Sequence, residues 1–196
     1  MLRIDRKLVF LDIEATHLDT LIARPWEIAM IERWPSGKER RTWIMIADVD
    51  TEHASERSLE VGRFAERHVN DGRSRWLSEE MAALWVARRL CEDHVLGRPM
   101  VVGSNVAGYD LPILAAMLDR HRYEPEWYHH PIDLVTWTQA REAQSPFGTV
   151  SLRKDGSYGL SELAGVPRPV SELAHTAMGD AQWARAWWDS VKGVIA

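Results

Sequence analysis

The sequence has one cysteine, no long apolar run and no excess of positive charge. A lone cysteine, Cys91, cannot form a disulfide within the chain, which is typical of proteins from a reducing compartment. No apolar stretch approaches the roughly 20 residues that a membrane-spanning helix needs, and the first residues carry no signal-peptide pattern. We therefore expect a cytoplasmic protein without a membrane segment. Cys91 follows the apolar periodicity of residues 81–90, so we expect its side chain to be buried.

The formal net charge of −5 argues against a protein that binds duplex nucleic acid through a broad basic face. It does not exclude an enzyme that clusters carboxylates around metal ions, because the ions supply positive charge locally. The 45% of hydrophobic and 27% of charged residues are ordinary for a globular protein. The length of 196 residues, without an internal repeat or a break in composition, predicts one domain over residues 1–196.

Five short apolar segments predict strands, and helical patterns lie between and after them. The first three strands are joined by short segments, which predicts an antiparallel meander. The strands are expected at residues 7–13, 26–34, 40–47, 99–103 and 132–134. Helices are expected at 54–68, 78–93, 110–122, 134–140, 160–164 and 179–194, with an exposed loop at 144–158. Strands followed by alternating helices and strands predict a layered α/β domain.

Two carboxylates, Asp12 and Glu14, lie two residues apart at the end of the first apolar strand. Alternate residues of a strand point to the same face, so these carboxylates repel each other. A divalent cation bound between them would remove that cost. The polar end of a strand entering a loop explains the same two residues equally well, so both interpretations stay open at this point.

Two later segments place polar side chains beside predicted helices. Asp110 opens a helix after a loop that contains Asn105, and taken alone it is explained best by helix capping. Asp180 falls on the apolar face of the last helix, where an unpaired carboxylate is unfavourable. His175 lies five residues earlier, in the preceding loop. Alone it is explained best as an exposed residue, but the inward carboxylate of Asp180 nearby favours a functional pair of His175 and Asp180.

Taken together, these segments resemble the three motifs of the DEDD exonucleases, in the subgroup whose general base is histidine. The first motif matches Asp12, Glu14 and Thr16, the second Asn105 and Asp110, and the third His175 and Asp180. The tyrosine subgroup would need a tyrosine at position 176, where this chain has threonine. The resemblance extends over roughly residues 8–191, and three ordered motifs are far more specific than any one of them. It implies a ribonuclease-H-like fold with a mixed five-stranded sheet and flanking helices.

The resemblance also implies the reaction and its cofactors. The reaction would be metal-dependent 3′→5′ hydrolysis of single-stranded DNA or RNA from its 3′ end, releasing 5′-mononucleotides. Two divalent cations, Mg²⁺ or Mn²⁺, would be held by four carboxylates: Asp12, Glu14, Asp110 and Asp180. Oxygen ligands without cysteine suit these metals. His175 would take the proton from the attacking water.

Contacts with the substrate are expected next to the first two motifs, from Thr16, His17, Leu18, Asn105 and Tyr109. His17 stands where the family usually has a glycine, which leaves the placement of the terminal nucleotide open. Tyr109 could stack on a base or pack in the core, and Asn105 could serve mainly to shape its loop.

Two alternatives and one assembly question accompany this interpretation. The spacing of five residues from Asn105 to Asp110 is similar to that of oligoribonuclease, so the substrate could be short RNA. Resemblance to that group also implies a possible homodimer. A non-catalytic nucleic-acid-binding module would be favoured by a missing carboxylate, and all four are in the sequence.

Overall fold

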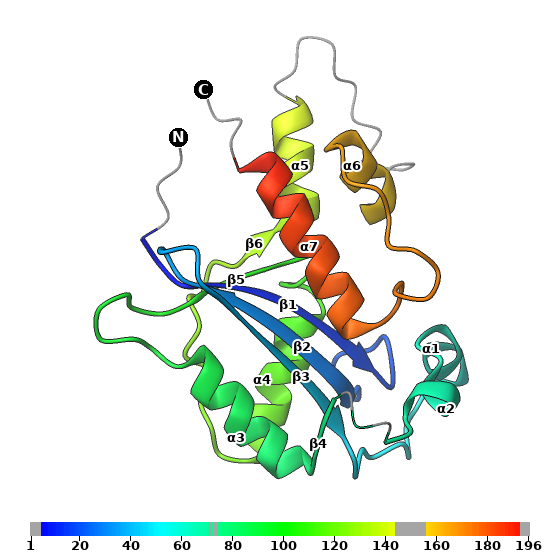
Figure 1. Cartoon of the computed structure of the whole chain (residues 1–196). Helices are drawn as coiled ribbons and strands as arrows, with labels where there is room; N and C mark the ends of the chain where they lie inside the picture. Colours follow the sequence, from blue (N-terminus) through cyan, green and yellow to red (C-terminus); the bar gives the residue numbers. More distant parts are fainter. Residues whose placement is uncertain (1–4, 71, 73, 144–155, 193–196) are drawn as a thin grey trace.

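The structure, a computed structural model, describes residues 5–70, 72, 74–143 and 156–192. These residues form a mixed six-stranded sheet in the order β4-β3-β2-β1-β5-β6, with helices on both faces (Figure 1). The strands are β1 (Leu8–Ala15), β2 (Pro25–Arg33), β3 (Glu39–Ile46), β4 (Arg75–Leu77), β5 (Met100–Gly103) and β6 (Ile132–Asp133). The helices are α1 (Glu56–Val61), α2 (Phe64–Arg67), α3 (Glu79–Leu90), α4 (Asp110–Arg120), α5 (Leu134–Ala143), α6 (Ser157–Leu163) and α7 (Ala177–Val191). In the described part of the chain no helix has the length and apolarity to cross a membrane.

Strand β1 lies inside the sheet, antiparallel to β2 and parallel to β5. Strand β3 continues the sheet antiparallel to β2, and β4 and β6 extend its two edges in parallel. The predicted meander and the mixed α/β sheet with flanking helices are confirmed. Strand β4 makes the sheet one strand larger than expected, because three residues are too few to show the alternation that identifies a strand.

The alternation of side chains along β1 divides the core between the two faces of the sheet. Val9, Leu11 and Ile13 pack with α3 and α4, whereas Leu8 and Phe10 pack with α7. Burying a large apolar side chain contributes about 1.5–3 kcal/mol, so this pattern fixes which face β1 turns to each helix. Asp12 and Glu14 occupy the next two positions on the α7 face. The apolar residues before them therefore place both carboxylates under the first turn of α7.

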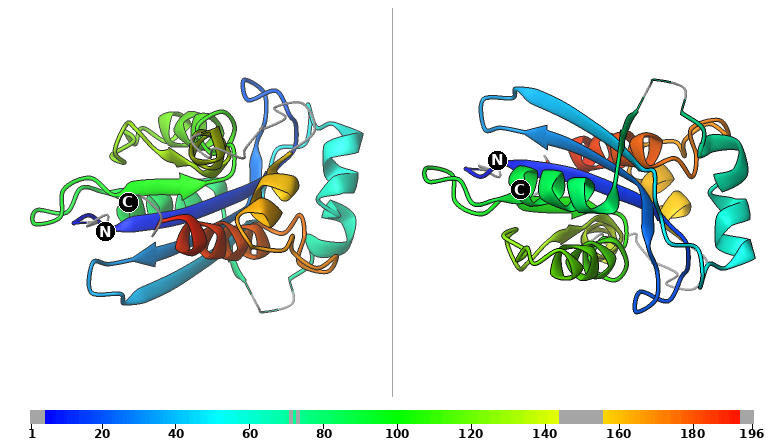
Figure 2. Two further views of the ribbon diagram at one scale, coloured as in Figure 1. Left: turned by 90° about the horizontal axis from the view of Figure 1, so that it is seen from above. Right: turned by 90° about the horizontal axis from the view of Figure 1, so that it is seen from below.

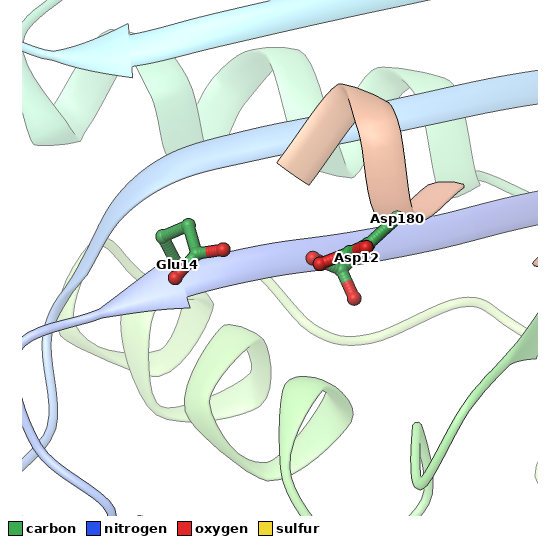
Figure 3. A group of neighbouring side chains, drawn as sticks. All are labelled: Asp12, Glu14 and Asp180. Carbon is green, nitrogen blue, oxygen red and sulfur yellow. The ribbon is translucent and has the colours of Figure 1, made fainter. Parts of the chain in front are cut away.

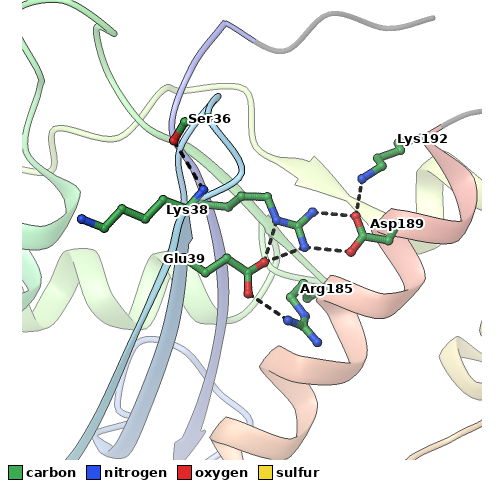
Figure 4. A network of polar contacts seen from close by, with 7 residues as sticks. Ser36, Lys38, Glu39, Arg185, Asp189 and Lys192 are labelled. Atoms are coloured by element: carbon green, nitrogen blue, oxygen red, sulfur yellow. Dashed lines mark hydrogen bonds and ion pairs between the residues drawn. The ribbon is translucent and has the colours of Figure 1, made fainter.

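Helix α7 is fixed to the sheet by buried apolar side chains and by a polar network near its C-terminal end. Trp187 is fully buried in the core beneath it. Arg33 of β2 contacts both carboxylate oxygens of Asp189 at 2.5 and 2.7 Å, and Glu39 accepts from both Arg33 and Arg185 (Figure 4). Partly exposed ion pairs contribute at most about 1 kcal/mol each, so burial holds the helix and the network fixes its orientation.

Two sequence predictions meet different outcomes around α3 and α6. Ser78 caps α3, since its hydroxyl accepts from the Met81 N–H at 3.3 Å. Cys91 is exposed, so the prediction that it is buried is wrong. The helix ends at Leu90, and the next residue leaves the buried stripe in extended backbone. Of the loop predicted at 144–158, residues 144–155 lie outside the described residues, and Ser157 already begins α6.

Candidate active site

A cavity of about 360 Å³ lies at the C-terminal end of β1. Helices α1 and α2 stand beside this end of the sheet, next to the first turn of α7 (Figure 2). Most residues that the sequence motifs singled out line this cavity: Asp12, Glu14, Leu18, Asn105, Tyr109, Asp110, His175 and Asp180. Three segments that are distant in sequence therefore meet at one place. Of the remaining candidates, Thr16 and His17 lie beside the cavity and do not line it.

Three carboxylates converge at the centre of the cavity. Asp12, Glu14 and Asp180 each offer an oxygen, and these oxygens lie within 4.8 Å of one another. Asp180 reaches from α7 toward Asp12 on the strand below, and Glu14 lies at the end of the same strand (Figure 3). The Oδ1 atom of Asp180 is buried without a hydrogen-bond partner among the described residues. An unpartnered carboxylate oxygen beside two others fits a divalent cation, which satisfies all three at once.

Asp110 is buried at the start of α4 and joins that helix to β1. Its Oδ1 atom accepts the backbone N–H of Ile13 at 3.0 Å. Burial raises its pKa to about 8. Hydrogen bonds from the backbone of Ile13 and of Asp110 itself lower the pKa, and the charge of Asp133 raises it further. The residue therefore does more than open its helix, since it lines the cavity and is bonded to the backbone of β1 between Asp12 and Glu14 in the sequence.

The pKa values of the other three carboxylates are raised as well. Burial is the largest cause for each. The pKa of Asp12 lies well above its usual value, that of Glu14 rises to about 8, and that of Asp180 rises to about 7. Mutual repulsion adds to burial, and Arg67 opposes it at Glu14 and Asp180. Near neutral pH the cluster therefore retains protons that a bound cation would displace.

His175 lines the cavity from the loop before α7 and has a left-handed backbone, with φ of 55°. Its N–H donates to Oδ2 of Asp180 at 3.1 Å, and its carbonyl accepts from Nη1 of Arg67 at 2.7 Å. Burial lowers the pKa of its ring, and the charges of Arg63 and Arg67 lower it further. The imidazole is therefore neutral near pH 7 and able to accept a proton.

Glu27 and Arg67 complete the site, although the sequence did not single them out for a role there. Glu27 is fully buried on β2, directly opposite Glu14. It pairs with Arg67 and accepts from Nε1 of Trp43 at 2.6 Å and from the Ala177 N–H at 3.1 Å. It thereby fixes the start of α7 to the sheet. Its one visible signal in the sequence is a carboxylate inside an otherwise apolar strand.

The expected substrate contacts divide into cavity residues and residues that support them. Tyr109 lines the cavity and donates its hydroxyl to the His17 carbonyl at 2.9 Å. Leu18 is 75% exposed at the rim. Thr16 is buried, and its hydroxyl accepts the Arg24 N–H at 2.9 Å, so it closes the loop between β1 and β2. Asn105 has a left-handed backbone, with φ of 57°, consistent with a role in shaping its loop.

Solved structures show what this arrangement resembles. The chain superposes on E. coli exonuclease I in a zinc-bound complex with single-stranded DNA, with a TM-score of 0.69 and 19% identity over 95% of this chain and 40% of that one. For E. coli exonuclease I in complex with a dT13 oligonucleotide the TM-score is 0.67, with 16% identity over 96% of this chain and 41% of that one. The chain has the fold of the part of exonuclease I that it covers.

Similarity to exonuclease I confirms the expected ribonuclease-H-like class and, at the level of the fold, the resemblance to DEDD exonucleases. This chain spans about two fifths of the length of those exonuclease I chains. No family model matches the sequence, and no curated protein is significantly similar to it. The geometry of the cavity therefore has to carry the argument about function.

Proposed function

We propose that this chain is a divalent-metal-dependent 3′→5′ exonuclease that hydrolyses single-stranded DNA to 5′-mononucleotides. The observation that carries the proposal is the convergence of Asp12, Glu14 and Asp180 within 4.8 Å, in one cavity with Asp110 and His175. The exonuclease I structures, two of them with DNA oligonucleotides, support it through the shared fold. Fold alone does not determine activity, so the proposal depends on the site.

The carboxylates account for the metal requirement. Asp12, Glu14 and Asp180 would hold one cation, and Asp110 would help to hold a second together with Asp12. Ligation by oxygen alone suits Mg²⁺ or Mn²⁺. Two such cations supply charge neutralisation on the phosphate and a more acidic water. The protein's part is to keep four mutually repelling carboxylates in place, and the Ile13–Asp110 and His175–Asp180 hydrogen bonds do this for Asp110 and Asp180.

His175 would take the proton from the attacking water, since its imidazole is neutral near pH 7 and lines the cavity. The new bond forms between the water oxygen and phosphorus. The bond from phosphorus to the 3′ oxygen of the preceding nucleotide breaks, that oxygen takes a proton from solvent water to become the new 3′ hydroxyl, and the phosphate leaves on the 5′ position of the released nucleotide. A positioned general base typically contributes a factor of about 10²–10⁴ in rate.

The size and rim of the cavity support recognition of a chain end. A volume of about 360 Å³ is at the small end of the range for ligand sites, which suits one nucleotide. Leu18 would pack against the terminal base, and Tyr109 and Asn105 would line the sugar and base from the opposite side. His17 would act through its backbone, because its carbonyl already accepts from Tyr109.

A side-by-side digest tests this function and its alternative. Strands labelled at the 5′ end are compared as single-stranded DNA, duplex DNA, long RNA and short RNA, with Mg²⁺ or Mn²⁺ and with EDTA. We expect a ladder that shortens from the 3′ end, fastest on single-stranded DNA and stopped by EDTA. Preference for short RNA would favour the oligoribonuclease alternative, and light scattering tests the homodimer proposed with it.

A further inference from the structure

A second hollow, of about 690 Å³, lies at the free edge of β3, on the other side of α7 from the catalytic cavity. Strand β4 pairs only with Ile44–Ile46, so no described strand covers the outer edge of residues 39–43. The hollow, here called the edge cleft, is lined mainly by basic and aromatic side chains: Arg41, Trp43, Arg75, Trp85, Arg89 and Gln182.

The edge cleft combines residues from both faces of the sheet. Through β2, Arg41 is in register with Phe10 and Trp43 with Asp12, so both face the α7 side, where the catalytic carboxylates lie. Trp85 and Arg89 belong to α3, on the opposite face. The cleft therefore wraps around an unpaired sheet edge, where a bound chain also meets free backbone groups.

Two arginines of the cleft are held in a defined orientation by one tryptophan. Arg75 lies 4.1 Å and Arg89 4.8 Å from the centre of the Trp85 ring. A guanidinium plane that rests on an aromatic ring keeps the N–H groups at its edge available, and their geometry matches phosphate oxygens. Arg41, on the opposite wall, is exposed. The three cations are thus arranged around a groove.

Among the described residues, the positive charge around the cleft exceeds that of the carboxylate paired with it. Within this part of the chain Arg89 pairs with buried Glu32, at 3.9 Å, and Glu32 also pairs with Arg40 at 2.6 Å and with Lys7 at 3.3 Å. The single carboxylate of Glu32 thus pairs with three cations, and Arg41 and Arg75 add further positive charge to the cleft. In a chain whose formal net charge is −5, such local positive charge marks a surface for a polyanion.

A further hollow extends from the cleft to the first turn of α7, where its residues Thr176 and Gly179 are next in sequence to His175 and Asp180 of the catalytic cavity. This hollow has a volume of about 550 Å³ and shares Trp43 and Gln182 with the cleft. The register gives the span, because Trp43 lies about 10 Å across two strand spacings from Asp12 and Arg41 about 7 Å further along β3. A strand a few nucleotides long could therefore reach both places.

We propose that the edge cleft binds the phosphodiester backbone of the substrate strand, on the 5′ side of the nucleotide held in the catalytic cavity. This inference rests on the proposed function. An extended acidic peptide could also pair with a free sheet edge. The nucleic-acid strand is favoured because the hollow along α7 continues the cleft as far as Thr176 and Gly179, the sequence neighbours of His175 and Asp180 in the cavity where its 3′ end would lie.

The test is the Arg41→Gln/Arg75→Gln double variant, measured in EDTA so that no turnover occurs. Binding of a long oligothymidylate should weaken by about tenfold, and the salt dependence should become shallower by about 1.4 in log–log slope, for two lost contacts to a single strand. Hydrolysis of a dinucleotide, which has one nucleotide outside the catalytic cavity and is too short to reach the cleft, should keep its kcat/KM. The matched control is Arg98→Gln/Lys192→Gln, which removes the same charge from exposed ion pairs elsewhere.

Three results would overturn the inference. The double variant could bind the strand with the affinity and salt dependence of the wild type, or the control could lose as much affinity as the double variant. Oligoglutamate could also displace the strand as effectively as unlabelled strand does. Failure of the proposed function gives a different result. A wild-type protein that binds the strand through Arg41 and Arg75 yet hydrolyses nothing would support binding in the edge cleft and refute the exonuclease activity. If the enzyme is active and its affinity for the strand does not depend on Arg41 or Arg75, only the proposal for the edge cleft is refuted.

Discussion

Arg67 donates a hydrogen bond of 2.7 Å to the backbone carbonyl of His175, while the same guanidinium pairs with the buried carboxylate of Glu27. It also donates to the Gly62 carbonyl at 2.8 Å. One side chain therefore fixes the left-handed segment that carries the proposed general base to β2 and to the segment between α1 and α2. We predict that Arg67→Gln lowers kcat by about 10²-fold, since a small displacement of a catalytic group has this effect.

Arg63→Gln is the matched control for Arg67→Gln. Arg63 also lowers the pKa of His175 through its charge, and it also donates to a backbone carbonyl, that of Glu172, at 3.0 Å. Both variants should raise the pKa seen in the acidic limb of the pH–rate profile, but only Arg67→Gln should lose kcat at the optimum. Equal losses of kcat in the two variants would show that Arg67 acts through charge alone.

Gly179 is a second point at which the geometry of α7 can be tested. A Cβ atom there would lie 2.2 Å from the Leu173 carbonyl oxygen and 2.6 Å from Oγ1 of Thr176, in the turn that presents Asp180. We predict that Gly179→Ala destabilises the fold by about 1–3 kcal/mol, which lowers Tm by roughly 2–4 °C per kcal/mol, and reduces activity. Gly156→Ala is the control, because a Cβ at that position meets no atom of the described residues within 4 Å. A Tm for Gly179→Ala equal to that of the control would refute the steric argument.

A substitution at His175 tests proton transfer separately from metal binding. Asparagine also adopts the left-handed backbone of this position, so His175→Asn should leave the loop and the hydrogen bond to Asp180 in place. We predict a fall in kcat of about 10²–10⁴-fold. Calorimetric titration with Mn²⁺ should give an affinity close to that of the wild type. A variant with unchanged kcat would assign the proton to another acceptor.

The raised pKa values predict how the metal-free protein responds to pH. The folded-state pKa values of Glu14 and Asp110 are about 8 and that of Asp180 about 7, above the values of unfolded carboxylates. The folded state therefore binds more protons, and the stability that they give is complete below about pH 4 and is lost as pH rises to about 8. In EDTA, Tm should fall from pH 5.5 toward pH 8, and Mn²⁺ should restore more stability at pH 8 than at pH 6. The comparison of thermal melts with and without metal checks this, and a Tm in EDTA that rises over the same range would contradict it.

Short apolar runs were enough to predict the centre of the sheet, and the alternation of side chains along a strand predicted that Asp12 and Glu14 share a face. Helical periodicity likewise predicted that Asp180 turns inward. Both patterns are local, and burial enforces them. The prediction for Cys91 failed because periodicity does not show where a helix ends.

Contacts between segments distant in sequence were beyond reach for a different reason. The pairing of Glu27 with Arg67 depends on the register of β2 and on the fold of residues 62–67, which no periodic pattern encodes. The same is true of the edge cleft, which exists because β4 covers only part of β3. The motifs thus indicated which residues meet at the site, and the tertiary structure shows what supports them.

The most direct test of the central claim is the release of 5′-mononucleotides from single-stranded DNA by the wild type and by Asp180→Asn, in Mg²⁺ or Mn²⁺. The substitution keeps the size of the side chain and removes the negative charge that Asp180 contributes to the cluster with Asp12 and Glu14. We predict that release is lost while the circular dichroism spectrum stays native and Tm in EDTA at pH 8 does not fall, since a repelling carboxylate has been removed. Release at the wild-type rate by Asp180→Asn would contradict the metal-dependent mechanism.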